Sequence, residues 1–130
     1  MGNLLEEDRT GSVLAAFFEV YGALGYGFLE HVYELAMERE LRARGHQVSR
    51  QVAVRVRYKG ADLATQRLDM LVDDRVILEF KSTAELPLAA KRQLHNYLRA
   101  TSLEVGPLLH FGPRPRFHRL VSTNTRPFNP

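Results

Sequence analysis

The chain has 130 residues, of which 45% are hydrophobic and 25% are charged. That length suits one domain of ordinary size, and the composition is that of an average globular protein. Disorder, a collagen-like repeat and a coiled coil are therefore excluded as descriptions of the whole chain. Because the sequence contains no cysteine, it also lacks a disulfide framework, a cysteine zinc site and a thiol nucleophile.

The formal net charge of +3 is unevenly distributed along the chain. Residues 1–45 carry four arginines against eight acidic residues, whereas residues 46–130 carry 14 basic and seven acidic residues. Arginine supplies 15 of the 18 cations, and the three lysines are Lys59, Lys81 and Lys91. An asymmetric, arginine-rich chain indicates an anionic partner such as nucleic acid, although a codon bias toward arginine explains the composition equally well.

The sequence shows neither a membrane span nor a secretory signal. Its longest apolar run, residues 13–18, is far shorter than the ~20 residues that a membrane-spanning helix needs. Residues 6–8 are all acidic, whereas a signal peptide begins with basic residues. We expect a soluble, cytoplasmic protein that does not bind a membrane, and the lack of cysteine agrees with a reducing compartment.

Two helices are predicted in the first third of the chain. Residues 1–9 are expected to be irregular, and a helix begins after Thr10 or Ser12, either of which could cap it. Its apolar residues recur every three or four positions until closely spaced glycines break or kink it. A second helix is predicted over residues 27–44, where Gly45 ends it.

Beyond the second helix the spacing of apolar residues changes to two, which predicts three consecutive strands. The first covers residues 48–58, with valines and a tyrosine on one face, polar residues on the other, and Arg50 as a misfit. The second strand is expected over residues 63–72 and the third over residues 75–81, each following a polar turn.

The last part of the chain is predicted to contain one more helix and two more strands. The helix covers residues 87–101, a buried strand covers residues 105–111, and a short edge strand covers residues 116–121. Residues 122–130 are expected to be an irregular tail. This order of elements predicts a single α/β or α+β domain, residues 1–130, with a mixed central sheet.

Most familiar catalytic motifs are missing from the sequence. It has no G-x-x-x-x-G-K-[ST] phosphate-binding loop and no G-x-S-x-G nucleophile turn. The five histidines lack the paired spacing of a metal site. The closely spaced glycines lie between two helices rather than after a strand, so they do not predict dinucleotide binding.

Two acidic residues, Asp69 and Glu79, lie inside predicted strands among apolar neighbours. Burying a carboxylate costs several kcal/mol unless it is paired or bound to a metal. Alternation places Glu79 and Lys81 on one face of their strand. One explanation is a structural ion pair of Glu79 with Lys81 or a nearby arginine. The other is a site for Mg²⁺ or Mn²⁺, with Asp69 and Glu79 as oxygen ligands and Lys81 beside them to orient a water or stabilise a phosphoryl transition state.

The metal-site hypothesis requires a particular length for the turn between the second and third strands. A two-residue turn at Asp73 and Asp74 would pair Asp69 with Leu78 and send the two acids to opposite faces. A loop of three or five residues, or a bulge, would place Asp69 opposite Glu79. The hypothesis therefore predicts a loop with an odd number of residues.

Glu30 and Gln93 are further candidates on the predicted helices. Glu30 lies at the edge of the apolar arc of the second helix, but Glu40 projects into the same arc, and a first-turn acid is also favoured by the helix dipole. Gln93 and Tyr97 lie one turn apart on one face of the third helix. They could contact a phosphate or a metal-bound water, or Tyr97 could be core and Gln93 solvent-exposed.

The segment from Gly27 to Tyr33, GFLEHVY, resembles the signature of the GxxExxY proteins. Other elements of that family pattern follow in order over about residues 12–121: Gln51-Val52, Tyr58-Lys59-Gly60, Arg67 to Val72, Val76 to Lys81, Gln93-Leu94, Tyr97-Leu98 and Leu108 to Phe111. This family is similar in turn to the PD-(D/E)XK nuclease superfamily. The resemblance implies a restriction-endonuclease-like αβββαβ core.

The resemblance also implies roles for individual residues. Asp69 would be the first acid of the motif, and Glu79 with Lys81 its acid-x-Lys element. Glu30 would be the helix carboxylate that completes the set of metal ligands, and Gln93 the residue on the helix after the core strands. The implied catalytic residues are thus Asp69, Glu79, Lys81 and Gln93, and the implied ligands of Mg²⁺ or Mn²⁺ are Glu30, Asp69 and Glu79.

These features together predict a divalent-metal-dependent nuclease that hydrolyses phosphodiester bonds in DNA or RNA. Leu68 replaces the proline that often precedes the first acid, but the four charged positions are intact. One alternative is a non-catalytic nucleic-acid-binding or assembly module on the same fold, and another is a structural protein whose acids only pair with arginines. Because so short a chain has little room for its own recognition domain, a protein partner or a homodimer could supply one.

Overall fold

The computed structural model describes residues 6–122, and the predicted order of helices and strands is confirmed with small shifts at their ends. None of the helices within this range is long and apolar enough to cross a membrane. In chain order the elements are α1 (Glu7–Leu24), α2 (Glu30–Ala43), β1 (Val48–Tyr58), β2 (Ala61–Val72), β3 (Val76–Lys81), α3 (Ala89–Ala100), β4 (Val105–Phe111) and β5 (Pro115–Val121).

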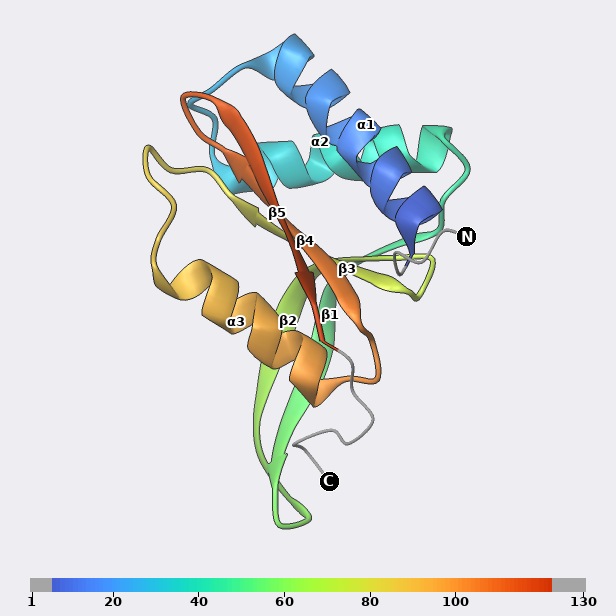
Figure 1. The fold of residues 1–130 in the computed structure, drawn as a ribbon, viewed down its shortest axis with the longest axis vertical. Coiled ribbons are helices and arrows are strands. Elements are labelled where there is room, and N and C mark those ends of the chain that lie inside the picture. Colours follow the sequence, from blue (N-terminus) through green and yellow to red (C-terminus); the bar gives the residue numbers. More distant parts are fainter. Residues whose placement is uncertain (1–5, 123–130) are drawn as a thin grey trace.

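The five strands form one mixed sheet in the order β1-β2-β3-β4-β5. Strands β3 and β4 run parallel, and the other neighbouring pairs are antiparallel. A parallel pair needs a crossover connection, which α3 supplies. Helices α1 and α2 pack on one face of the sheet and α3 packs on the other (Figure 1). The predicted fold class, an α+β domain with a mixed sheet flanked by helices, is confirmed.

Each face of the sheet has its own hydrophobic core. On the side of α1 and α2, the Phe111 ring stacks on Tyr33 with ring centroids 4.1 Å apart and meets Phe17 edge-on at 4.8 Å. On the side of α3, Leu94 and Leu98 pack among apolar residues of the sheet. Strand β4 is buried along its whole length and contributes to both cores, so it lies in the interior of the fold.

Helix α1 begins at Glu7, earlier than the predicted start after Thr10 or Ser12, and so includes part of the segment expected to be irregular. Thr10 is buried, which indicates that packing extends the helix beyond its capping signals. The helix also passes through Gly22 and ends only at Gly25, whose backbone φ is 71°. The remaining residues of the two predicted tails, 1–5 and 123–130, lie outside the described residues.

Strand β1 does not keep one apolar face along its length, contrary to the prediction. Val48 packs with α1 and α2, whereas Val54 packs against α3. The change of face occurs at Gln51, which has a left-handed backbone with φ 53°. Strand β2 changes face at the same level, because Met70 and Leu68 are two residues apart and lie in different cores. Because of the left-handed backbone at Gln51, residues on either side of it that a regular strand would place on the same face point to opposite faces of the sheet.

Residues 53–67 form a two-stranded ribbon, which we call the arm. The backbone of β2 pairs with both neighbours at residues 70–72, but over residues 61–68 it pairs only with β1. Figure 1 shows the arm as the green hairpin that extends away from the helices at the foot of the view. Val54 near its base is buried, whereas residues 57–67 are all exposed.

A three-residue loop, residues 73–75, joins β2 to β3, since Val72 pairs with Val76. Asp73 and Asp74 both have a positive φ, of 54° and 55°, a conformation that aspartate adopts more readily than most residues. The same register places Asp69 opposite Glu79. The odd-numbered loop that the metal-site hypothesis requires is therefore present.

Gly106 in β4 occupies a position where close packing leaves no room for a side chain. A Cβ atom there would lie 2.9 Å from the carbonyl oxygen of Ile77 and 3.0 Å from a methyl group of Leu94. We predict that Gly106→Ala lowers the free energy of unfolding by about 1–3 kcal/mol, because β3 cannot move away without disturbing the sheet. Urea denaturation followed by circular dichroism measures the change.

The matched control is Gly22→Ala, at an exposed position of α1 where a Cβ atom would meet nothing within 4 Å. There the substitution should raise stability by up to ~1 kcal/mol, because alanine favours the helix. A Gly106→Ala variant as stable as the wild type would contradict the tight packing of β4 against β3.

Candidate active site

Strands β2 and β3 separate at Asp69 and Glu79, and side chains continue the hydrogen bonding where the backbone ladder ends. The Asp69 backbone N–H donates to Glu79 Oε2 at 2.9 Å, and the Phe80 N–H donates to Asp69 Oδ2 at 2.8 Å. Each carboxylate thus satisfies a backbone group on the opposite strand that would otherwise lack a partner. We call the opening between the strands at Asp69 and Glu79 the fork.

Burial raises the pKa of both carboxyl groups at the fork. For Glu79, which is 5% exposed, burial and the neighbouring Asp69 carboxylate raise the pKa to about 8. The pKa of Asp69 is raised by burial and by the charge of Glu34, while the N–H of Phe80 opposes the rise. In both cases the nearby Lys81 ammonium also opposes the rise without cancelling it. The surroundings therefore do not neutralise two ionised carboxylates, and without a cation Glu79 keeps its proton at neutral pH.

Glu30, the first residue of α2, lies close to the same charges. Burial and the Asp69 carboxylate raise the pKa of Glu30, while Lys81 and the backbone N–H of Ser82 oppose the rise. The structure therefore brings Glu30, Asp69, Glu79 and Lys81 into one neighbourhood. These are the four charged residues that the sequence singled out.

The loop before Glu30 is held in place by hydrogen bonds to both neighbouring elements. The Tyr33 hydroxyl donates to the Gly25 carbonyl at 2.6 Å and accepts from the Phe28 N–H at 3.3 Å. The Ser82 hydroxyl, just beyond β3, donates to the Phe28 carbonyl. The start of α2 is thus tied to the end of the strand that carries Glu79 and Lys81.

Glu34 is a further acid of this site that the sequence analysis did not identify. It is 4% exposed, and its Oε1 accepts from Arg50 Nε at 3.1 Å and from Gln51 Nε2 at 2.9 Å. Its charge contributes to the raised pKa of Asp69. Two signals were present in the sequence, because Glu34 lies one turn after Glu30 and because Arg50 breaks the alternation of its strand.

On the other side of the fork, α3 contributes Gln93 and Tyr97. Tyr97 is buried in the core, and its hydroxyl accepts a hydrogen bond from Gln93 Nε2 at 3.0 Å. Burial raises the pKa of Tyr97, and the charges of Glu79 and Asp69 raise it further, so the hydroxyl lies near the fork. Gln93 itself is exposed, and its link to the fork runs through Tyr97. Tyr97 is thus both a core residue and part of the site.

The structure does not support the explanation in which these acids serve only in ion pairs. Within residues 6–122, no salt bridge includes Asp69, Glu79 or Lys81. Over the same range, no group of three or more carboxylate or imidazole side chains converges closely enough to hold a metal ion as placed. The carboxylates at the fork instead bind backbone N–H groups.

The chain thus has a mixed sheet flanked by helices, with two acids and a lysine where two of its strands part, as the resemblance to nucleases implies. A family model described as the PD-(D/E)XK nuclease superfamily matches residues 7–120. This range contains every residue of the candidate site. The chain therefore belongs to the PD-(D/E)XK nuclease superfamily, which confirms that part of the resemblance seen in the sequence.

A solved structure, described as the crystal structure of SSO0001, has a similar fold. It matches with a TM-score of 0.59 and 21% sequence identity, over 89% of this chain and 59% of that chain. At this identity the likeness concerns the fold alone, and this chain spans less than two thirds of that protein. No curated protein matches the chain.

The raised pKa of Glu79 makes stability depend on pH in the metal-free protein. The folded state holds this proton up to a pH of about 8, whereas a glutamate in the unfolded chain loses it near 4.5. The resulting stabilisation is complete below about pH 4.5 and is lost as the pH rises through about 8. We predict that in EDTA the free energy of unfolding falls by on the order of a few kcal/mol over this range, and falls less for Glu79→Gln.

Denaturant unfolding at a series of pH values measures this difference. Glu85→Gln, at an exposed position, serves as the control and should follow the wild-type curve. Parallel curves for the wild type and Glu79→Gln would contradict a strongly raised pKa at the fork.

Proposed function

We propose that this protein is a divalent-metal-dependent nuclease that hydrolyses phosphodiester bonds in DNA or RNA. The observation that supports the proposal is the fork, where Asp69 and Glu79 lie opposite each other and, among the described residues, form no salt bridge. A buried pair of carboxylates of this kind favours an added positive charge. The superfamily supplies the nuclease-like fold on which this pair lies.

The chemistry of the side chains fits Mg²⁺ or Mn²⁺. Glu30, Asp69 and Glu79 offer the hard oxygen ligands that these ions prefer. Their raised pKa values reflect burial and mutual repulsion, which a cation would relieve. When bound, the ion would act as a Lewis acid toward the phosphate and favour ionisation of the attacking water.

Lys81 and the pair on α3 have roles that follow from their positions. The Lys81 ammonium lies near all three acids and can donate a hydrogen bond to the attacking water or to a phosphate oxygen. Gln93 positions the Tyr97 hydroxyl through their hydrogen bond, and its exposed amide is available to the substrate. A nucleic acid is the substrate that this set of groups suits.

A non-catalytic nucleic-acid-binding module on the same fold is the second candidate. The observation that favours it is the absence, within residues 6–122, of a converged group of metal ligands, since Asp69 and Glu79 each bind a backbone N–H. In that case the two carboxylates only hold the fork in shape. Binding that persists in EDTA and in a Glu79→Ala variant, without any cleavage by the wild type, would distinguish this function from a nuclease.

Cleavage of labelled DNA and RNA by the purified protein in Mg²⁺ or Mn²⁺ tests the proposal. We expect Asp69→Asn, Glu79→Gln and Lys81→Gln each to lower the cleavage rate by ~100-fold or more, because each removes a charge that acts on the reacting phosphate. EDTA should abolish cleavage in the wild type.

The matched control is Asp74→Asn, which removes an exposed carboxylate from the loop of the same hairpin. Asparagine tolerates the left-handed backbone of this position, so the variant should cut at the wild-type rate. The proposed nuclease function would be refuted if Asp69→Asn still cleaved at the wild-type rate, or if the wild type cut neither DNA nor RNA with either metal.

A further inference from the structure

The arm is exposed on both faces for most of its length and begins next to the fork. Tyr58 and Leu63 near its tip are 59% and 63% exposed. At about 3.4 Å per residue, six or seven residues in each strand reach roughly 20 Å beyond the sheet. A two-stranded ribbon gains little stability from its own packing, so its length is better explained by a partner that it contacts.

The arm carries a surplus of positive charge. It contains four cations and one acid, Asp62, which Arg55 approaches at 3.6 Å and Arg57 at 3.1 Å. Strand alternation places Arg55, Arg57 and Arg67 on one face of the ribbon, opposite the face on which Val54 packs against α3. With four cations and one acid the arm has a formal net charge of +3, which suits it to an anionic partner.

The helices on the two faces of the sheet differ in charge. Helix α3 contains Lys91, Arg92 and Arg99 and no acid. On the opposite face of the sheet, α1 and α2 together contain seven acids and three arginines. A polyanion that approaches the fork is therefore attracted to α3 and to the arm and repelled from α1 and α2, although the three arginines of the arm lie on the face of the ribbon away from α3.

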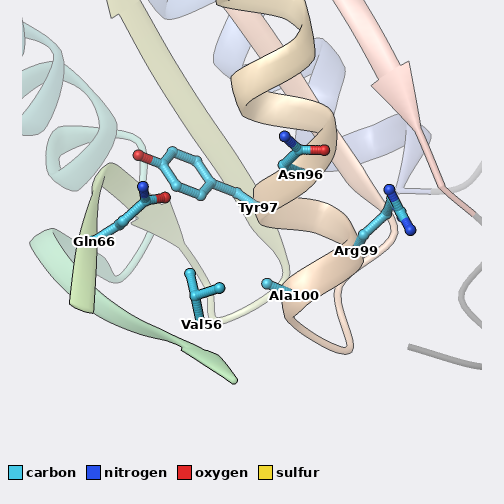
Figure 2. Close-up of a pocket in the computed structure, with 6 residues that line it drawn as sticks. All are labelled: Val56, Gln66, Asn96, Tyr97, Arg99 and Ala100. Atoms are coloured by element: carbon cyan, nitrogen blue, oxygen red, sulfur yellow. The ribbon is translucent and has the colours of Figure 1, made fainter. Parts of the chain in front are cut away.

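A groove lies between the arm and α3. It has a volume of about 340 Å³ and is lined by Val56 and Gln66 of the arm and by Asn96, Tyr97, Arg99 and Ala100 of α3. Figure 2 shows Tyr97 reaching from α3 toward Gln66, with Val56 and Ala100 at the other end of the groove. Tyr97, whose hydroxyl is bonded to Gln93, therefore belongs both to this groove and to the candidate site.

We infer that the arm and α3 form the surface that holds double-stranded DNA, with the arm in the major groove. This inference rests on the proposed function and narrows its substrate. Two strands about 4.8 Å apart, with their side chains, fit the major groove of B-form DNA, which is about 12 Å wide. Double-stranded RNA has a major groove too narrow for such a ribbon, and a single strand has no groove to receive it.

Charge also argues against a second copy of the chain as the partner. Pairing of two arms edge to edge through β1 would bring eight cations together with only two acids. The phosphates of DNA neutralise the same cations and release their bound counterions. Duplex DNA is therefore the partner that the arm fits better.

Binding of a fluorescent DNA duplex, measured by anisotropy in an Asp69→Asn background that prevents cleavage, tests the inference. We expect Arg55→Gln/Lys59→Gln in the arm to weaken binding about tenfold or more at 0.1 M salt and to reduce the slope of log K against log salt by about 2. The control is Arg39→Gln/Arg44→Gln, in and just after α2, which removes the same charge from the opposite layer. Each double variant removes one arginine that forms a salt bridge, and thermal melts establish that both are folded.

Equal binding by the arm variant and the control would overturn the inference, as would tighter binding of single-stranded DNA or duplex RNA than of duplex DNA. A wild type that binds no DNA and forms a dimer that the arm variant disrupts would assign the arm to self-association instead. Cleavage is measured separately, in the chain with Asp69 intact. Arm-dependent binding without cleavage would support the docking surface and refute the proposed nuclease activity. Cleavage that the arm variant leaves unchanged would support the nuclease activity and refute the docking surface.

Discussion

Two hydrogen bonds between backbone N–H groups and carboxylates, at Asp69 and Phe80, hold the shape on which the rest of the site depends. Strands that part inside a protein leave donors and acceptors unpaired, and each such group costs about 1–3 kcal/mol. Here the side chains of Asp69 and Glu79 take the place of the missing carbonyls. The same two residues thus permit the strands to separate and place two carboxyl groups side by side where they do.

The fold converts an uneven distribution of charge along the chain into an uneven distribution in space. The acidic first third becomes the α1–α2 layer and contributes Glu30 and Glu34 to the site from that side. The basic remainder supplies the arm, α3 and Lys81. The net charge of +3 therefore describes neither side of the molecule, and the site lies where the two regions meet.

The fold class, the order of elements and the positions of Asp69, Glu79 and Lys81 could be predicted, because apolar periodicity and an acid inside a strand are local signals. The start of α1 and the role of Glu34 could not, since they depend on packing and on a partner distant in sequence. The change of face at Gln51 was also missed. Glycine or asparagine commonly marks a left-handed residue, but glutamine gives no such signal. Here Glu34 binds the glutamine amide, and Arg67 donates to its carbonyl at 3.1 Å.

The hydrogen bonds of Glu34 couple α2 mechanically to the base of the arm. One oxygen of Glu34 accepts hydrogen bonds from both Arg50 and Gln51, which lie just before the arm, and Glu30 lies one turn away on the same helix. A force that displaces the arm is therefore transmitted through these hydrogen bonds to a buried carboxylate. A load on the arm is thus borne by the helix that carries Glu30.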